Sequence, residues 1–133
     1  MVEGGCHCGA VRFAVEGAPV FSAICHCADC RRCSGAPLVA VGLFAADAFQ
    51  WTRGEARAYA SSENTRRYFC GACGTGLAYV NEVLLPGIVD IRLAALDDPE
   101  TFPPTDQLQT GDALSWMTAA HTLTAHVGYP PST

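Results

Sequence analysis

Hydrophobic and polar residues alternate with a period of two along much of this chain, and that period is typical of half-buried β-strands. In the segment "CGAVRFAVEG", Val11, Phe13 and Val15 fall on one face and charged residues on the other. The same alternation returns over residues 88–93, after a Pro-Gly turn. Between them, residues 37–45 form a continuous apolar run, which predicts a strand buried on both faces. The pattern therefore predicts an all-β domain.

Shorter elements are expected between these strands. Residues 18–24 predict a strand that ends at Cys25, and residues 28–34 fit one helical turn that stops at Gly35 and Pro37. These elements place a short helical segment directly after a strand end that carries cysteines.

The middle of the chain is divided by glycines. The segments "FQWTRG" and "ARAYAS" predict a hairpin with Gly54 in its turn. The stretch "CGACG" then forms a glycine-rich turn between two strand-like pieces, and residues 96–106 read as a loop. No linker and no long repeat divides the chain, so we expect residues 1–133 to form one domain.

Composition excludes several classes of protein. The 133 residues carry a formal net charge of −5, and all eight basic residues are arginine. Such an acidic chain is a poor candidate for binding the phosphates of nucleic acid. No apolar run approaches the roughly 20 residues of a membrane helix, and the start lacks the basic and apolar regions of a secretory signal. We therefore expect a cytoplasmic protein with no membrane partner; the sequence indicates no oligomeric state.

Eight cysteines are the strongest chemical signal in the sequence. In a reducing compartment, structural disulfides are disfavoured, so metal binding or redox chemistry is expected instead. Cysteine pairs from distant parts of the chain can make one closed, structural zinc site of four thiolates: Cys6, Cys8, Cys70 and Cys73. A lone C-x-x-C could be redox-active, but a second pair in the same chain favours zinc.

A second cluster lies in "CHCADCRRCSG". Cys25, Cys27 and Cys30 would give three thiolates on one short segment, and catalytic zinc typically has three protein ligands and an open fourth position. Alternatively, Cys33 closes the site, since it lies three residues after Cys30 and can share its helical face. The spacing alone leaves both readings open.

These motifs resemble a known family. The segments "GGCHCGAVRF", "CHCADCRRCSGAP", "SSENTRRYFCGACGTGL" and "LDDPETFPP", followed by Trp116, occur in the order seen in the glutathione-dependent formaldehyde-activating enzymes, a family that also includes centromere protein V. The resemblance covers about residues 3–117. It implies an all-β fold of several small coiled antiparallel sheets around a four-cysteine zinc knuckle site.

The same resemblance assigns the cysteines to two zinc ions. A structural zinc would be held by Cys6, Cys8, Cys70 and Cys73, and a second, catalytic and labile zinc by Cys25, Cys27 and Cys30. Family members usually carry another residue where Cys33 stands, which favours an open second site. They also often carry His-Ile where this chain has Gln107-Leu108.

The chemistry implied by the resemblance joins glutathione to formaldehyde, giving S-(hydroxymethyl)glutathione, a carbon–sulfur lyase type of reaction. Zinc could hold the thiol as a thiolate or polarise the aldehyde, and three thiolate ligands favour the first use. Arg31 and Arg32 would bind the carboxylates of a glutathione-like thiol, with Arg66 and Arg67 as a second candidate pair. The competing hypothesis is a zinc-stabilised binding module without catalysis.

Ordinary structural roles are expected for other notable side chains. His7 and His26 lie in the middle of C-x-C pairs and are expected to be exposed rather than to bind metal. Asp29 is expected to be a solvated loop carboxylate. Trp116 and Phe44 are expected in the core, as aromatic residues of small β-domains usually are.

Overall fold

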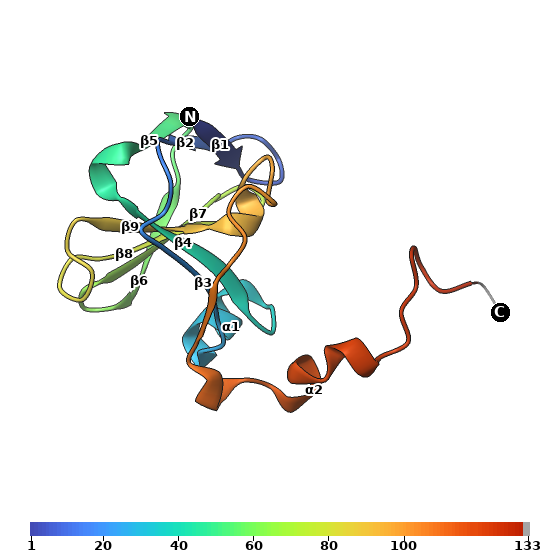
Figure 1. The fold of residues 1–133 in the computed structure, drawn as a ribbon. Helices are drawn as coiled ribbons and strands as arrows, with labels where there is room; N and C mark the ends of the chain where they lie inside the picture. Colours follow the sequence, from blue (N-terminus) through green and yellow to red (C-terminus); the bar gives the residue numbers. More distant parts are fainter. Residues whose placement is uncertain (132–133) are drawn as a thin grey trace.

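The computed structural model describes residues 1–131, in which ten β-strands form two sheets. The smaller sheet (Figure 1) has three strands, in the order β1 (Val2–Gly5), β2 (Arg12–Val15) and β5 (Phe49–Arg53). The larger sheet has seven strands, in the order β10 (Asp106–Leu108), β3 (Phe21–Cys25), β4 (Val39–Ala45), β9 (Ile88–Arg92), β8 (Gly76–Asn81), β7 (Thr65–Phe69) and β6 (Arg57–Ser62). The all-β prediction is confirmed.

Helical structure is limited to short pieces. The two α-helices are α1 (Ala28–Ser34), as the sequence predicts, and α2 (Ser115–Thr118). Single 3-10 turns complete the described part of the chain: η1 (Ala46–Ala48), η2 (Leu93–Ala95), η3 (Thr110–Asp112) and η4 (Ala120–Thr122). Within residues 1–131, no helix has the length and apolar character needed to cross a membrane.

Most of the large sheet follows the predicted order of turns. β7 and β8 form a hairpin around the glycine-rich cysteine turn, and β8 then pairs antiparallel with β9. The exception to the antiparallel pattern among the described strands is β10, which runs parallel to β3 and pairs Leu108 with Cys25. This pairing brings residues 106–108 beside the start of the second cysteine segment.

The predicted hairpin around Gly54 is wrong. β5 pairs with β2 in the small sheet, whereas β6 pairs with β7 in the large sheet. Aromatic packing explains the separation, because the ring of Phe13 lies 5.5 Å from that of Phe49 and 6.3 Å from that of Trp51. These contacts hold β5 against β2, so the chain crosses between sheets at Gly54 instead of folding back.

The core lies between the two sheets and includes the residues whose alternation is clearest in the sequence. Val11, Phe13 and Val15 are all buried, as predicted, together with Phe44 of β4. The core also contains Cys6 and Cys70, one cysteine from each distant pair. Part of the four-cysteine set therefore belongs to the packed interior.

The C-terminal segment, residues 113–131, differs from the rest of the chain. It contains no Asp, Glu, Lys or Arg, and its ribbon extends away from the body of the molecule past α1 (Figure 1). Trp116 is 57% exposed, so the expectation that it lies in the core is wrong. Trp116 instead lines a small surface pocket of about 310 Å³ with Arg31 and Pro37.

Candidate functional site

The structure gathers seven of the eight cysteines into two groups. In each group, the sulfur atoms lie within 4.8 Å of one another. The first group contains Cys6, Cys8, Cys70 and Cys73, and the second contains Cys25, Cys27 and Cys30. The groupings match those expected from the cysteine spacing, although the first one joins segments more than sixty residues apart.

Two similar turns position the four-cysteine group. In the first, Gly9 donates its N–H to the Cys6 carbonyl at 3.1 Å, and in the second, Gly74 donates to the Cys70 carbonyl at 2.8 Å. Both glycines have positive φ, 80° and 84°, a conformation that side chains rarely adopt. The glycine after each cysteine pair therefore lets the chain bend around the sulfurs.

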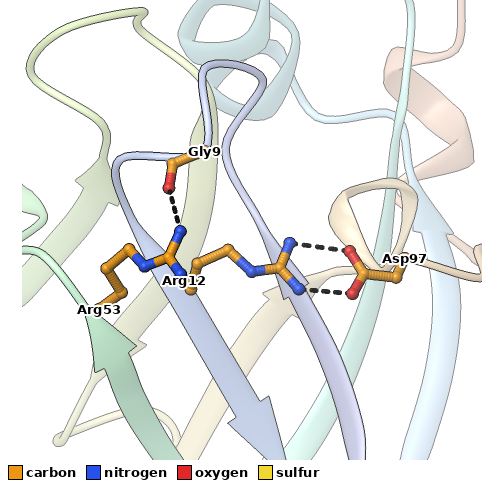
Figure 2. Close-up of polar contacts among 4 residues, drawn as sticks. All are labelled: Gly9, Arg12, Arg53 and Asp97. Carbon is orange, nitrogen blue, oxygen red and sulfur yellow. Dashed lines mark hydrogen bonds and ion pairs between the residues drawn. The ribbon is translucent and has the colours of Figure 1, made fainter.

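Polar contacts join and brace the two turns. The Thr75 hydroxyl accepts the His7 N–H at 3.1 Å and lies 3.2 Å from the Cys73 sulfur. Arg53 donates to the Gly9 carbonyl at 3.5 Å, while Arg12 forms a two-pronged ion pair with Asp97 (Figure 2). These contacts fix the N-terminal turn to the rest of the molecule.

The geometry of this group fits zinc. A tetrahedral zinc with sulfur ligands at about 2.3 Å separates the sulfurs by about 3.8 Å. The Cys6 and Cys8 sulfurs are 3.6 Å apart, and those of Cys8 and Cys70 are 3.8 Å apart. The Cys6 sulfur also accepts the Val11 N–H at 3.2 Å, which stabilises a thiolate.

Without a cation, the thiols of this group oppose one another's ionisation. The hydrogen bond from Thr75 lowers the pKa of Cys73 to about 5. Although the Ala10 backbone N–H acts to lower the pKa of Cys8, the Cys6 side chain raises it, and the net value is about 11. A divalent cation at the centre would remove this conflict, because it stabilises all the thiolates together.

The three-cysteine group is built at the junction of β3 and α1. Cys25 is the last residue of β3 and is buried, whereas Cys27 is the N-cap of α1. The Cys27 sulfur accepts the Cys30 N–H at 3.3 Å, in the manner of an N-capping side chain. The strand end and the first helical turn thus bring three sulfurs together within six residues.

The pKa values in this group follow from burial and from the helix start. Burial raises the pKa of Cys30 to about 12. Burial also acts to raise the pKa of Cys27, but the Cys30 N–H lowers it, and the net shift is downward. With a pKa of about 12, the Cys30 thiol stays protonated at neutral pH unless a cation compensates its charge. A donor set of three thiols suits a thiophilic metal such as zinc.

Cys33 lies outside both groups. It is exposed on α1, and the four-thiolate alternative for the second site is not the arrangement that the structure adopts. Cys33 nevertheless lines the same large pocket as Cys30.

This pocket has a volume of about 960 Å³, large enough for a metabolite such as a tripeptide. Its wall combines parts of α1, β4, β6, β7, β8 and β9. Three arginines line the pocket: Arg32, Arg67 and Arg92. No aspartate or glutamate of the described residues lines it. A pocket with only positive charges, in a chain of net charge −5, suits an anionic ligand.

The candidate arginines take different positions. Arg32 lines the pocket, as an anion-binding residue must, whereas Arg31 donates its Nε to the His26 carbonyl at 3.1 Å. Arg66 is exposed and bonds nearby backbone carbonyls, but its neighbour Arg67 reaches the pocket. Sequence analysis did not identify Arg92 as a pocket residue. The alternation over residues 88–93 could have indicated it, because it places Arg92 on the face opposite the buried Val89 and Ile91.

His26 corrects another expectation. It is only 2% exposed, not solvated as predicted, and its Nε2 donates to Gln107 Oε1 at 2.9 Å. The parallel pairing of β10 with β3 causes this burial, because it lays Gln107 beside Ile24. His7, in the other C-x-C pair, is exposed as expected, and so is Asp29.

A β-sheet scaffold with one cysteine group anchored in its core by Cys6 and Cys70, and another that reaches a large pocket through Cys30, defines a cysteine-rich protein able to hold metal ions. Residues 1–112 match the family described as glutathione-dependent formaldehyde-activating enzyme. The chain belongs to this family. Residues 113–131 lie beyond the matched region.

Two individual proteins are similar to this chain. A Halomonas elongata protein with the name "Putative glutathione-dependent formaldehyde-activating enzyme" is 31% identical over 112 residues, covering 78% of this chain and 71% of that protein. The crystal structure of a Rhodobacter sphaeroides protein has a TM-score of 0.60 and 25% identity, over 79% of this chain and 98% of that one.

Proposed function

We propose that this protein is a zinc-dependent enzyme of the carbon–sulfur lyase type that joins a glutathione-like thiol to a small aldehyde such as formaldehyde. The observation that carries the proposal is that Cys30 of the three-cysteine group lines a pocket whose charged lining residues are all arginines. A closed structural metal site has no need of such a pocket. The family name supplies the thiol and the aldehyde.

The proposed roles of the cysteines follow from their surroundings. Cys6, Cys8, Cys70 and Cys73 would hold a structural zinc, and Cys25, Cys27 and Cys30 a second, catalytic zinc. Zinc bound there would keep a substrate thiol deprotonated at neutral pH. We propose the cytoplasm as its location, because a reducing compartment keeps cysteines free of disulfides, as all eight are in the structure. We further propose that residues 1–133 act as one domain.

The reaction itself needs no oxidant. A substrate thiolate attacks the carbonyl carbon of the aldehyde, forming a carbon–sulfur bond as the carbon–oxygen π bond breaks. The aldehyde oxygen takes up the proton that the thiol released, which gives the S-(hydroxyalkyl) product. The reverse reaction cleaves the same bond.

The chain's own side chains would orient the thiol. Arg32 is exposed at the pocket wall, and its planar guanidinium can hold both oxygens of a carboxylate. Of the pair Arg31 and Arg32, we propose Arg32 as the contact with the carboxylates of glutathione. Arg31 would act indirectly by fixing α1 through its bond to His26.

The test is formation of the hydroxymethyl adduct from glutathione and formaldehyde, followed by NMR with zinc-loaded protein. The account predicts a rate above the spontaneous reaction that Cys30→Ser abolishes. A rate equal to the spontaneous one, with both zinc ions bound, would favour the zinc-stabilised binding module instead.

A further inference from the structure

The arginines of the pocket differ in burial and in the partners that hold them. Arg32 lies exposed on α1, Arg67 is half-buried on β7, and the side chain of Arg92 on β9 is 13% exposed. The two more buried guanidiniums therefore lie deeper in the wall than Arg32. Their positions raise the question of which part of a ligand they would contact.

Strand register brings Arg67 and Arg92 to one face of the large sheet. Arg67 pairs with Tyr79 across β7 and β8, and Tyr79 pairs with Asp90 across β8 and β9. Residues paired in this way share a face, and Arg92, two residues after Asp90, shares it as well. Tyr79 and Asp90 therefore share a sheet face with the two pocket-lining arginines.

Each of these guanidiniums is fixed in place. Asp90 accepts from Arg92 at 2.8 Å, and its own side chain is 12% exposed. Arg67 donates its Nε to the Ser61 hydroxyl at 3.0 Å and lies 5.0 Å from the centre of the Tyr79 ring. Held side chains lose little entropy on binding a ligand.

Arg67 keeps a free donor. Its Nη1 is buried and has no hydrogen-bond partner among residues 1–131. A buried guanidinium N–H without a partner is costly, so a site with such a donor favours a ligand that accepts from it. Because Arg67 and Cys30 line the same pocket, a sulfur anion held at the three-cysteine group could accept from this donor.

Both arginines share a pocket with the three-cysteine group. Arg67 and Arg92 line the same pocket as Cys30, and so does Arg32, which lies exposed on α1. The two more buried arginines therefore supply positive charge to a pocket whose wall includes one sulfur-bearing residue of that group.

The net charge of a zinc site with a bound thiolate explains why positive side chains would be needed in this pocket. Three thiolates and one zinc ion sum to −1, and a substrate thiolate would make the sum −2. Negative charge in a partly buried pocket needs compensation. Arg67 and Arg92 supply two positive charges, with Asp90 offsetting one of them.

We propose that Arg67 and Arg92, with Asp90 as the positioning residue of Arg92, form a sulfur-facing anion site that recognises the thiolate of the substrate, whichever group the thiol carries. This inference rests on the proposed function and extends it to a substrate class. Arg32 would add affinity for thiols with carboxylates, but small uncharged thiols would bind as well. The division separates recognition of the sulfur from recognition of the rest of the molecule.

The experiment is calorimetric titration of the zinc-loaded full chain, without aldehyde, with glutathione and with uncharged 2-mercaptoethanol. Zinc content is measured after each titration. Arg67→Met and Arg92→Met should each weaken both thiols by about tenfold or more, because each loses a hydrogen bond to a charged group. Arg67→Lys should restore part of the affinity for both thiols by restoring the charge.

The matched control is Arg66→Met. Arg66 is the neighbour of Arg67 on β7, is exposed and does not line the pocket, so both affinities should stay at the wild-type level. Thermal melting checks the fold of each variant. If Arg67→Met does not fold, Arg67→Lys decides. It must still bind both thiols more weakly than wild type does, with a similar loss for glutathione and for 2-mercaptoethanol, since lysine cannot reproduce the guanidinium fork.

Two results would overturn the inference while leaving the proposed function in place. In the first, wild type binds both thiols and Arg67→Met binds them as tightly as wild type does. If Arg67→Met does not fold, the same result from Arg67→Lys counts. In the second, the Arg67 variant weakens glutathione alone, which would make Arg67 a carboxylate contact. If wild type binds neither thiol, the inference and the proposed function both fail.

Discussion

The two cysteine groups differ in how the chain assembles them. The four-cysteine group joins turns near residues 6–9 and 70–74, and Cys6 and Cys70 are buried in the core. The three-cysteine group spans six residues at one strand end, and Cys30 lines an open pocket. A metal in the first group would cross-link distant parts of the fold, whereas a metal in the second would be held locally. The contrast indicates a structural role for the first and a chemical role for the second.

The largest expected effect is on the four-cysteine group. Cys73→Ser should unfold the domain or lower its melting temperature severely, because a zinc ion that bridges the two turns contributes directly to folding free energy. Thermal melting followed by circular dichroism checks this. A melting temperature near that of wild type would mean that these turns are stable without the metal.

The next effect concerns the three-cysteine group. Cys30→Ser should keep the fold, lose one zinc ion per chain and lose the carbon–sulfur chemistry, because the remaining two sulfurs bind zinc weakly. Cys33→Ser is the matched control, one helical turn further along α1, and should keep both metal and activity. Zinc content and adduct formation are measured on both variants. Loss of zinc from Cys33→Ser would show that the second site is closed.

Stability should also depend on the buried carboxyl beneath the pocket. Burial raises the pKa of Asp90 to about 6 from its ordinary value of 3.8. The folded state therefore binds this proton more tightly than the unfolded state, so this group's contribution to stability falls as the pH rises from about 4 to about 6. At about 1.4 kcal/mol per pKa unit, the fall amounts to about 3 kcal/mol.

Denaturant unfolding across this pH range checks the Asp90 prediction. The free energy of unfolding of Asp90→Asn should lack this fall, whereas Asp47→Asn, which removes an exposed carboxylate on η1, should retain it. Parallel pH profiles for wild type and Asp90→Asn would show that Asp90 does not titrate in this range.

A smaller effect separates the neighbouring arginines of α1. Arg32→Ala should weaken glutathione binding by about tenfold, because a charge-assisted contact with a carboxylate is lost. Arg31→Ala should leave glutathione affinity within a factor of a few and lower the melting temperature instead, since its Nε holds the His26 carbonyl. Calorimetry and thermal melting on both variants measure this. The reverse pattern would exchange the roles of the two residues.

Local patterns in the sequence predicted what depends on local structure. Alternation identified the buried face of β2, and the residues before Gly35 identified α1. The cysteine spacing also predicted both groups, because each pair or triplet is shaped by its own turn. Such features need few contacts from elsewhere in the chain.

What the sequence did not reveal depends on pairing between distant strands. β5 joins β2 because of aromatic packing, and no property of the Gly54 turn indicates it. His26 is buried because β10 lies parallel to β3, more than eighty residues later in the chain. Arg92 and Arg67 share one face only through the register of three strands. Trp116 lies on α2, in the C-terminal segment that extends from the body of the molecule (Figure 1), and its aromatic character alone did not indicate that exposure.

The most direct test of the difference between the two groups is stepwise removal of zinc. Protein purified without chelator is titrated with a metallochromic chelator while released zinc and circular dichroism are recorded together. The account predicts two equivalents per chain: one released early without loss of secondary structure, and one released late, together with unfolding. A single class of zinc, or unfolding that accompanies the first equivalent, would contradict the assignment of one structural and one chemical site.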